Sequence, residues 1–148
     1  MKGRVLIVED ELELAELIQM YLLKDGIDSE ICLDAESALS RLNAAQFDLL
    51  VLDINLPGMD GFEFLQEIRP RIDVPVIIVS AREADEDIIM GLGAGADEFV
   101  TKPFTPRVLV ARIRALLRRS RTTARHDLTF GPFSIDMEGY FLRRGEER

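Results

Sequence analysis

Four groups of polar residues, each at the end of a short apolar run, have the chemistry to bind a phosphoryl group and a divalent cation together. They are Glu9-Asp10-Glu11, Asp53-Ile54-Asn55, Ser80-Ala81 and Lys102-Pro103. Carboxylate oxygens suit Mg²⁺, which binds through a few carboxylates and keeps water and phosphate oxygens as its other ligands. The hydroxyl and the amine are suited to phosphoryl oxygens. Taken together, the four groups predict a phosphoryl–Mg²⁺ site.

Each group alone has a simpler interpretation. Asp10 or Ser80 could do no more than cap the helix that follows it, and a single lysine before a proline carries little information. Asp53 follows four apolar residues, so we expect it to be partly buried, where an ionised carboxylate is costly unless something compensates it. It is the joint arrangement that indicates a site.

Five short β-branched runs, each followed by a stretch with helical spacing, must position these groups. The predicted strands are Arg4–Val8, Ser29–Leu33, Leu49–Leu52, Val76–Val79 and Glu98–Thr101. Between them apolar residues recur at i, i+3, i+4 and i+7, which is typical of helices packed on one face. This alternation predicts an α/β fold with a doubly wound, five-stranded parallel sheet that ends by about residue 119. In such a sheet, ligands bind beyond the carboxyl ends of the strands, where all four groups would lie.

Composition excludes several other classes of protein. The chain has 148 residues, of which 47% are hydrophobic and 30% charged, enough apolar material for one well-packed domain. No apolar run approaches the roughly 18 residues of a membrane span. The apolar run near the N-terminus is too short for a signal peptide. We therefore expect a cytoplasmic protein that does not enter a membrane. A single cysteine, Cys32, and a single histidine, His126, exclude a disulfide framework and the usual zinc sites.

Charge divides the chain into an acidic body and a basic segment. Residues 1–104 carry 22 acidic and eight basic side chains, whereas residues 105–126 carry seven arginines and no acid. Phosphate contacts dominate affinity for nucleic acid, so the acidic body is not expected to bind DNA.

The C-terminal region is predicted to begin a second domain. Residues 120–126 have no apolar periodicity and are predicted to be a linker. From residue 127 the sequence alternates apolar and polar residues and then turns, which favours two short antiparallel strands. Two strands are not stable alone. We therefore expect residues 1–119 to form one domain and residues 127–148 the first piece of another.

These motifs, at their spacing, resemble the receiver domains of two-component response regulators. The residues that carry the resemblance are Val8-Glu9-Asp10, Asp53 to Gly61, Ser80-Ala81 and Lys102-Pro103-Phe104, and it covers residues 3–119. Segments 91–104 and 109–119 are similar to the OmpR/PhoB-type subfamily, in which a winged-helix DNA-binding domain follows; Leu128 to Gly131 with Asp136 resembles its opening strands. The resemblance implies a flavodoxin-like receiver fold with strand order 2-1-3-4-5. It also implies a transcription regulator that binds DNA only through an effector domain, most of which would lie beyond Arg148.

The resemblance further implies how a phosphoryl group is bound. Asp53 would accept it from a phosphohistidine on a sensor histidine kinase. Asp10, Asp53 and the backbone carbonyl of Asn55 would ligate Mg²⁺ directly, and Glu9 would act through water. Lys102, after a cis Lys102–Pro103 bond, would pair with a phosphoryl oxygen. Such a protein is not an enzyme in the ordinary sense, although it assists its own phosphorylation and dephosphorylation.

Two residues are assigned to the conformational response by the same resemblance. Ser80 would hydrogen-bond another phosphoryl oxygen, and Phe99 would swing inward as Ser80 moves.

A departure from the subfamily pattern lies on its dimerisation face. Phosphorylated members form homodimers through a small apolar patch ringed by ion pairs. The positions that match are Ile89, Leu92 and Ala111 in the patch, and the ring pairs Glu98–Arg112 and Asp97–Arg119. A third ring pair, usually basic and acidic, is replaced by Ile88 and Val108. These two could be ordinary exposed apolar residues; our hypothesis is that the ion pair has become a hydrophobic contact across the dimer.

Three other functions share features of this sequence. A haloacid-dehalogenase-like phosphatase would carry an Asp-x-Asp pair after its first strand and would need a cap domain. A flavodoxin-like FMN-binding protein would place a Ser/Thr-rich phosphate loop there, whereas this chain has Glu9-Asp10-Glu11. A stand-alone receiver that acts by protein contact is harder to exclude, and the apparent effector strands argue against it.

Overall fold

The computed structural model of the chain describes residues 3–82 and 84–130, in which strands and helices alternate. The strands are β1 (Arg4–Val8), β2 (Asp28–Cys32), β3 (Leu49–Asp53), β4 (Val76–Ser80) and β5 (Glu98–Thr101). The helices are α1 (Leu12–Lys24), α2 (Ala35–Ala44), α3 (Gly61–Ile68), α4 (Asp85–Gly93) and α5 (Pro106–Phe130). The predicted alternation of strands and helices is confirmed, with strand ends shifted by one residue at most.

The five strands form one parallel sheet in the order β2-β1-β3-β4-β5. The strand order reverses at β1, so β1 and β3 lie side by side although β2 intervenes in the chain. This confirms the predicted doubly wound sheet and its order 2-1-3-4-5. Ligands of such sheets bind at the reversal point, beyond the carboxyl ends of β1 and β3.

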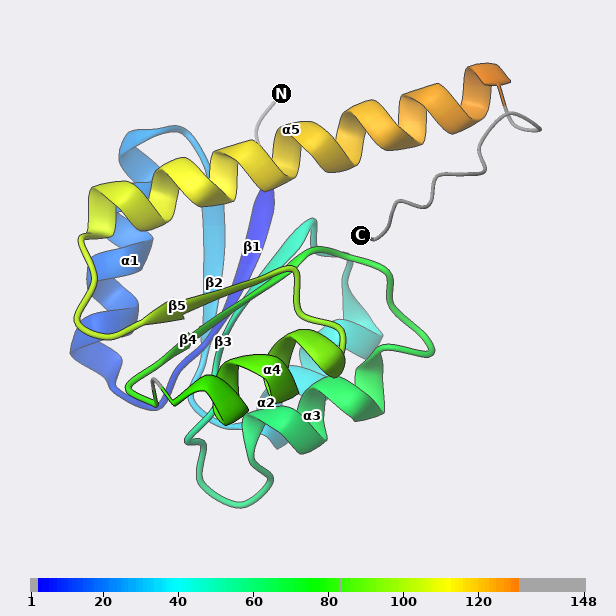
Figure 1. Cartoon of the computed structure of the whole chain (residues 1–148). Coiled ribbons are helices and arrows are strands. Elements are labelled where there is room, and N and C mark those ends of the chain that lie inside the picture. The colour runs from blue at the N-terminus through cyan, green and yellow to red at the C-terminus, as the bar shows by residue number, and fades with distance from the viewer. Residues whose placement is uncertain (1–2, 83, 131–148) are drawn as a thin grey trace. The chain divides into compact units, whose positions relative to one another are not determined.

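The sheet is covered on both faces, which explains why its central strands are almost entirely apolar. Leu6 and Val8 of β1 pack on the side of α2 and α3, whereas Val5 and Ile7 pack against α1 and α5. Figure 1 shows α2, α3 and α4 on one side of the sheet and α1 with the first part of α5 on the other. Successive residues of a strand point to opposite faces, so each central strand contributes to both cores.

Two local features fix the start of α3 close to the end of β3. Asp60 and Glu63 form a capping box, in which each side chain accepts a hydrogen bond from the other's backbone N–H. Gly61 is required because a Cβ there would lie 2.6 Å from the backbone oxygen of Asp53. The helix can therefore begin directly beside the polar end of β3.

The structure differs from the prediction after residue 119. Residues 120–126, predicted as a linker, and Leu128 to Phe130, predicted as the start of a strand, belong to α5. The physical reason is that residues 107–130 contain no glycine or proline, so nothing ends the helix before Gly131-Pro132. The remainder of the predicted effector fragment, residues 131–148, lies outside the described residues. The chain divides into two compact units, residues 1–117 and 118–148; their assignment as receiver and effector domains stays a prediction.

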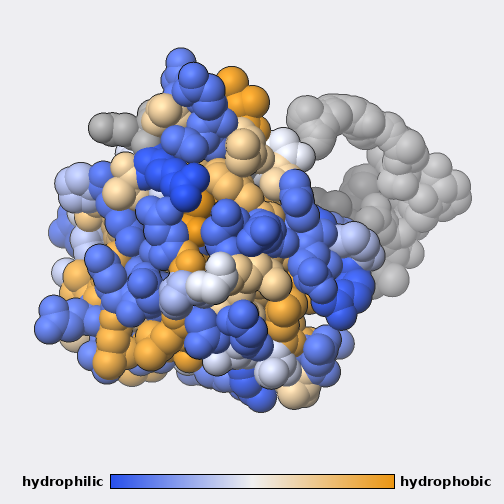
Figure 2. Space-filling view, turned by 90° about the horizontal axis from the view of Figure 1, so that it is seen from below, coloured by the Kyte–Doolittle hydropathy of each residue, from blue (hydrophilic) through white to orange (hydrophobic). Residues whose placement is uncertain are grey.

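Two surface properties bear on function. The face seen in Figure 2 mixes hydrophilic and hydrophobic residues rather than presenting one continuous apolar area. Across the described residues, no helix is both long and apolar enough to cross a membrane.

Candidate functional site

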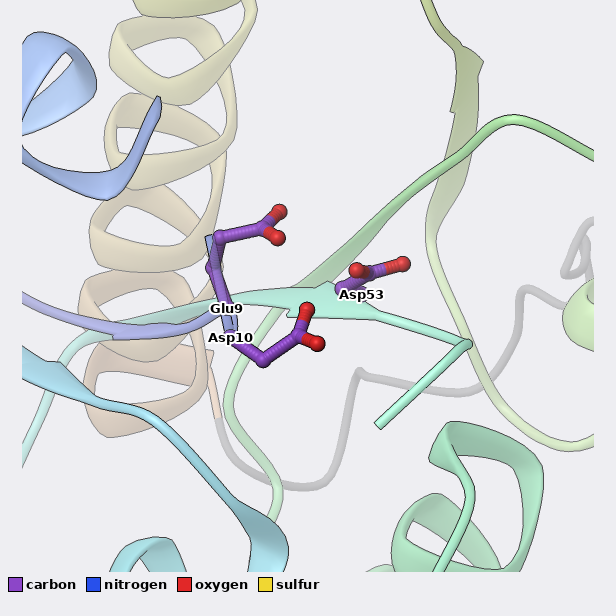
Figure 3. Close-up of side chains that lie close together, drawn as sticks. All are labelled: Glu9, Asp10 and Asp53. Carbon is purple, nitrogen blue, oxygen red and sulfur yellow. The ribbon is translucent and has the colours of Figure 1, made fainter. Parts of the chain in front are cut away.

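Three carboxylates meet at the reversal point of the sheet. Glu9 and Asp10 directly follow β1, and Asp53 is the last residue of β3. One oxygen from each lies within 4.8 Å of the other two, and Figure 3 shows the three side chains directed into the same space. Glu9 and Asp53 are 2% and 4% exposed, whereas Asp10 is exposed. The sequence predicted this cluster, and the structure brings it together.

Lys102 compensates part of the buried negative charge. Its Nζ lies 3.2 Å from Oε1 of Glu9, 3.5 Å from Oδ2 of Asp53 and 3.9 Å from Oε1 of Glu11. Burial by itself would lower the pKa of Lys102, but the carboxylates of Asp53 and Glu9 outweigh it and raise that pKa. Burial also raises the pKa of Glu9 to about 7, helped by the negative charge of Asp53. One ammonium does not balance these carboxylates, so the site keeps a net negative charge, which favours a cation.

Backbone groups orient the same side chains. The N–H of Glu11 donates to Oε2 of Glu9 at 3.1 Å, and the N–H of Asn55 donates to Oδ1 of Asp53 at 3.2 Å. The N–H of Lys102 donates to the carbonyl of Ser80 at 2.8 Å. The Lys102–Pro103 peptide bond is cis, as the family resemblance implies.

Ser80, the fully buried last residue of β4, does not contact the carboxylates directly. Its Oγ accepts a hydrogen bond from the backbone N–H of Arg82 at 3.0 Å. The side chain of Arg82 in turn reaches Asn55, where Nε and Nη2 donate to Oδ1 at 3.0 and 2.8 Å. Sequence reasoning missed Arg82. A basic residue two positions after Ser80, within a strongly acidic region, was the available signal.

Phe99, in β5, is half-buried and packs against α4. A Cβ on Gly91 would lie 2.9 Å from Cδ2 of Phe99 and 2.8 Å from Cδ1 of Ile78. The ring therefore fills the space that Gly91 leaves between α4 and the sheet. A change in the position of this ring therefore alters its packing against α4.

The face formed by α4, β5 and α5 exposes several apolar side chains. Ile89 is 69% exposed, Val108 50% and Leu92 45%, Ala111 is exposed and Ile88 is half-buried. This is the face on which the sequence predicts a dimer.

The charged positions of that face make contacts within the chain. Arg112 Nη1 lies 3.0 Å from Oε1 of Glu98. Asp97 Oδ2 accepts from the N–H of Val76 at 2.8 Å and from Nη2 of Arg69 at 3.2 Å. Arg119 is exposed. No pair of these residues is shown across two chains, so the dimer stays a prediction.

Comparison with known proteins identifies the family. The sequence profile of the response regulator receiver domain matches residues 5–114, about three quarters of the chain. The chain belongs to the receiver domain family. This is not a family of classical enzymes, and the assignment favours the predicted function over a haloacid-dehalogenase-like phosphatase or an FMN-binding protein.

Two curated relatives and one solved structure resemble this receiver. The DNA-binding response regulator MtrA of Mycolicibacterium smegmatis is 36% identical over 148 residues, 99% of this chain and 65% of the relative. The sensory transduction protein RegX3 of Mycobacterium tuberculosis is 42% identical over 142 residues, 93% of this chain and 63% of the relative. The chain therefore spans just under two thirds of the length of either relative. The receiver domain of the Francisella response regulator 1452 superimposes with a TM-score of 0.78 at 34% identity, covering 80% of this chain and 99% of that one.

The acidic cluster of this receiver fits a small divalent cation. One carboxylate oxygen from each of Glu9, Asp10 and Asp53 lies within 4.8 Å of the other two, close enough for the group to hold one ion. All three are hard oxygen donors, which favour Mg²⁺ over softer metals. Exposure of Asp10 leaves the outer side of the site accessible to the waters that Mg²⁺ retains.

Proposed function

We propose that this chain is the phosphoacceptor part of a two-component response regulator in the cytoplasm. In this proposal, Asp53 accepts a phosphoryl group from a phosphohistidine of a sensor histidine kinase. One observation carries the proposal: a nearly buried aspartate ends β3 among two further carboxylates and a lysine ammonium. The family assignment supports it independently.

The chemistry follows from these groups. An oxygen of the Asp53 carboxylate forms the new bond to phosphorus as the bond from phosphorus to the histidine nitrogen breaks, and the imidazole leaves with the electron pair. Asp10, Asp53 and the backbone carbonyl of Asn55 would hold Mg²⁺, with Glu9 acting through water. The bound ion would neutralise charge on the transferred group. Lys102 would pair with a phosphoryl oxygen, because its Nζ already lies 3.5 Å from Asp53.

The proposed response to phosphorylation runs from Ser80 to α4. Ser80 would turn its hydroxyl toward the phosphoryl group, and Phe99 would move inward at the same time. Because Phe99 packs against Gly91 of α4, this movement changes the face that carries Ile89 and Leu92. The receiver would then form a homodimer, and in the whole protein this would control DNA binding by the effector domain and hence transcription. The name of the relative MtrA, a DNA-binding response regulator, supports the last step.

Intact mass spectrometry tests the proposed phosphorylation. The protein is incubated with acetyl phosphate and Mg²⁺. We expect the wild-type mass to increase by one phosphoryl group. We expect no increase when EDTA removes the Mg²⁺, and none in Asp53→Asn. Asp48→Asn, which changes an exposed aspartate just before β3, is the matched control and should be labelled normally. Equal labelling of Asp53→Asn would show that another residue is the acceptor.

A further inference from the structure

The side chain of Arg82 connects three elements beside the phosphoacceptor site. Its Nε and Nη2 donate to Oδ1 of Asn55, in the loop after β3, at 3.0 and 2.8 Å. Its Nη1 lies 3.6 Å from Oδ1 of Asp87 in the first turn of α4. Its Cζ lies 5.6 Å from the ring centre of Phe62 in α3. One guanidinium thus joins the loop after β3, α3 and α4.

Asn55 and Arg82 each donate a hydrogen bond to a residue that is proposed to bind the phosphoryl group. The N–H of Asn55 donates to Oδ1 of Asp53 at 3.2 Å, and the N–H of Arg82 donates to Oγ of Ser80 at 3.0 Å. The acceptor carboxylate and the proposed switch hydroxyl are therefore each one hydrogen bond from the Arg82–Asn55 pair. Ser80 is fully buried, so its hydroxyl has few other directions in which to turn.

The start of α4 depends on contacts from outside the helix. The N-cap residue, Ala84, provides no side-chain cap, and Asp87 is one of three acidic residues in the first turn. The arginine reaches Asp87 from the preceding loop while Asn55 holds the other side of the guanidinium. The side chain of Arg82 is 38% exposed, so water competes with the ion pair and the clasp is releasable rather than permanent.

We propose that Arg82 is a positioning residue that clasps α4 to the loop after β3 in the unphosphorylated receiver and is released when Asp53 carries a phosphoryl group. This inference rests on the proposed function. When the Ser80 hydroxyl turns toward the phosphoryl group, it gives up the hydrogen bond from the Arg82 N–H. The loop at Arg82 is then held only by the contacts of its side chain with Asn55 and Asp87. A clasp that is present only in the ligand-free state lowers the apparent affinity for any ligand of the released state.

A beryllofluoride titration tests the clasp. With Mg²⁺, beryllium fluoride imitates the phosphoryl group on aspartate, and ¹⁹F NMR measures how much is bound. Arg82→Lys keeps the positive charge but lacks the planar fork that reaches Asn55 and Asp87 together. We expect it to bind beryllofluoride about three- to tenfold more tightly than wild type. Asp87→Asn keeps the bonds to Asn55, and its affinity should rise by a smaller factor.

Two further measurements separate a clasp from a merely structural role of Arg82. Arg71→Lys, at an exposed arginine beyond α3, is the matched control and should bind as wild type does. Amide hydrogen exchange should quicken in Arg82→Lys at Ile88, whose N–H donates to the carbonyl of Ala84 in the first turn of α4. An arginine with only a structural role would lower the melting temperature when replaced and leave the affinity unchanged.

The possible failures are distinguishable. Wild-type protein that binds no beryllofluoride overturns the proposed function, and the clasp with it. Wild-type protein that binds, with Arg82→Lys equal to or weaker than it, overturns the clasp alone. Should Arg82→Lys fail to fold, unchanged affinity of Asp87→Asn against wild type is the outcome that rejects the link to α4.

Discussion

The proposed site of this receiver combines side chains of very different exposure, and their roles follow from that difference. Asp53 and Glu9 are almost completely buried and are partly balanced by Lys102, whereas Asp10 faces solvent. A buried carboxylate is held in one position, so it suits a nucleophile, while an exposed one suits a ligand of a hydrated ion. Placement of acids after strands was predictable from sequence, because a parallel sheet brings its carboxyl ends together.

Arg82 shows where residue-level prediction stops. Its contacts with Asn55 and Asp87 depend on side-chain rotamers and on the path of the loop after β4, and neither has a period that a sequence displays. Lys102 was predictable only through the joint arrangement, because it follows a strand at the same edge of the sheet as the acidic groups.

Removal of a direct metal ligand is the first prediction at this scale. Asp10→Ala should weaken Mg²⁺ binding at least about tenfold more than Glu9→Gln, or about 1.4 kcal/mol, because the alanine removes an inner ligand and the glutamine only a contact through water. Isothermal titration calorimetry suits a chain without tryptophan. Equal losses in the two variants would show that Asp10 is not an inner ligand.

The second prediction concerns acid stability and the pair Glu30–Arg41. The hydrogen bond from Arg41, together with its charge and that of Arg4, lowers the pKa of Glu30 below its usual value of 4.5. The folded state therefore binds this proton less readily than the unfolded chain, so the pair stabilises the protein above about pH 4.5 and the contribution is lost as the pH falls through the folded-state pKa. Both side chains are partly exposed, so water screens the pair and its contribution to stability is small.

Urea unfolding of Glu30→Gln measures this contribution. The variant should be less stable than wild type at pH 7, and the difference should shrink as the pH falls through the lowered folded-state pKa of Glu30. Glu67→Gln, at an exposed position in α3, is the control and should show no such convergence. A difference that stays constant with pH would assign the effect to packing rather than to charge.

At the scale of elements, hydrophobic periodicity located each helix and strand but not the length of α5. Strands β1, β3 and β4 are recognisable because burial on two faces requires continuous apolar runs. Helix α5 continues to Phe130 where the apolar spacing fades, because the segment contains no glycine or proline to end it. Apolar periodicity indicates a helix only where apolar residues recur, so it does not locate the end of a helix that continues past them.

Helix α4 carries the third prediction, since it contains two glycines with opposite surroundings. A Cβ on Gly93 would meet nothing within 4 Å, whereas one on Gly91 would lie 2.8 Å from Ile78 and 2.9 Å from Phe99. Gly93→Ala should therefore raise the free energy of unfolding by up to about 1 kcal/mol, because alanine has the higher helix propensity. Gly91→Ala should lower it, because the sheet and the Phe99 ring must shift. Thermal unfolding compares the two; a loss of stability in Gly93→Ala would mean that this end of α4 is not helical in solution.

At the scale of the whole molecule, acidic and basic charge are separated along the chain. The acidic residues lie mainly before residue 105, while seven arginines fall within residues 107–125. The curated relatives are longer than this chain, which spans 65% and 63% of their length.

The fourth prediction is that this chain by itself does not bind specific DNA with useful affinity. The arginines should give only weak attraction, because phosphate contacts are independent of sequence and are screened by salt. In gel-shift assays at low and moderate salt, binding should weaken as salt rises and should not distinguish two unrelated duplexes. A preference for one duplex that persists at moderate salt would contradict the prediction.

The proposed dimer belongs to the scale of the whole molecule, and Ile88 and Val108 would give it a distinctive salt dependence. Val108 is 50% exposed and Ile88 is half-buried, where the subfamily usually has an ion pair. In a two-fold dimer, Ile88 of each subunit would meet Val108 of the other, so the contact occurs twice. An exposed ion pair contributes about 0–1 kcal/mol and weakens with salt, whereas a buried Ile–Val contact contributes about 1 kcal/mol per copy and does not.

The final prediction is therefore that the Ile88→Lys, Val108→Glu dimer weakens more steeply as salt rises than the beryllofluoride-treated wild-type dimer, because the variant adds an ion pair to the two ring pairs of the wild type. Analytical ultracentrifugation at low and high salt measures both. The matched control, Met20→Lys with Leu23→Glu, places the same charges on exposed apolar positions of α1 and should behave as wild type, because α1 lies on the other side of the sheet from α4. If restored charges change neither the strength nor the salt dependence of the dimer, Ile88 and Val108 do not meet across it. The hydrophobic replacement is then wrong, although the family assignment, which rests on residues 5–114 as a whole, is unaffected.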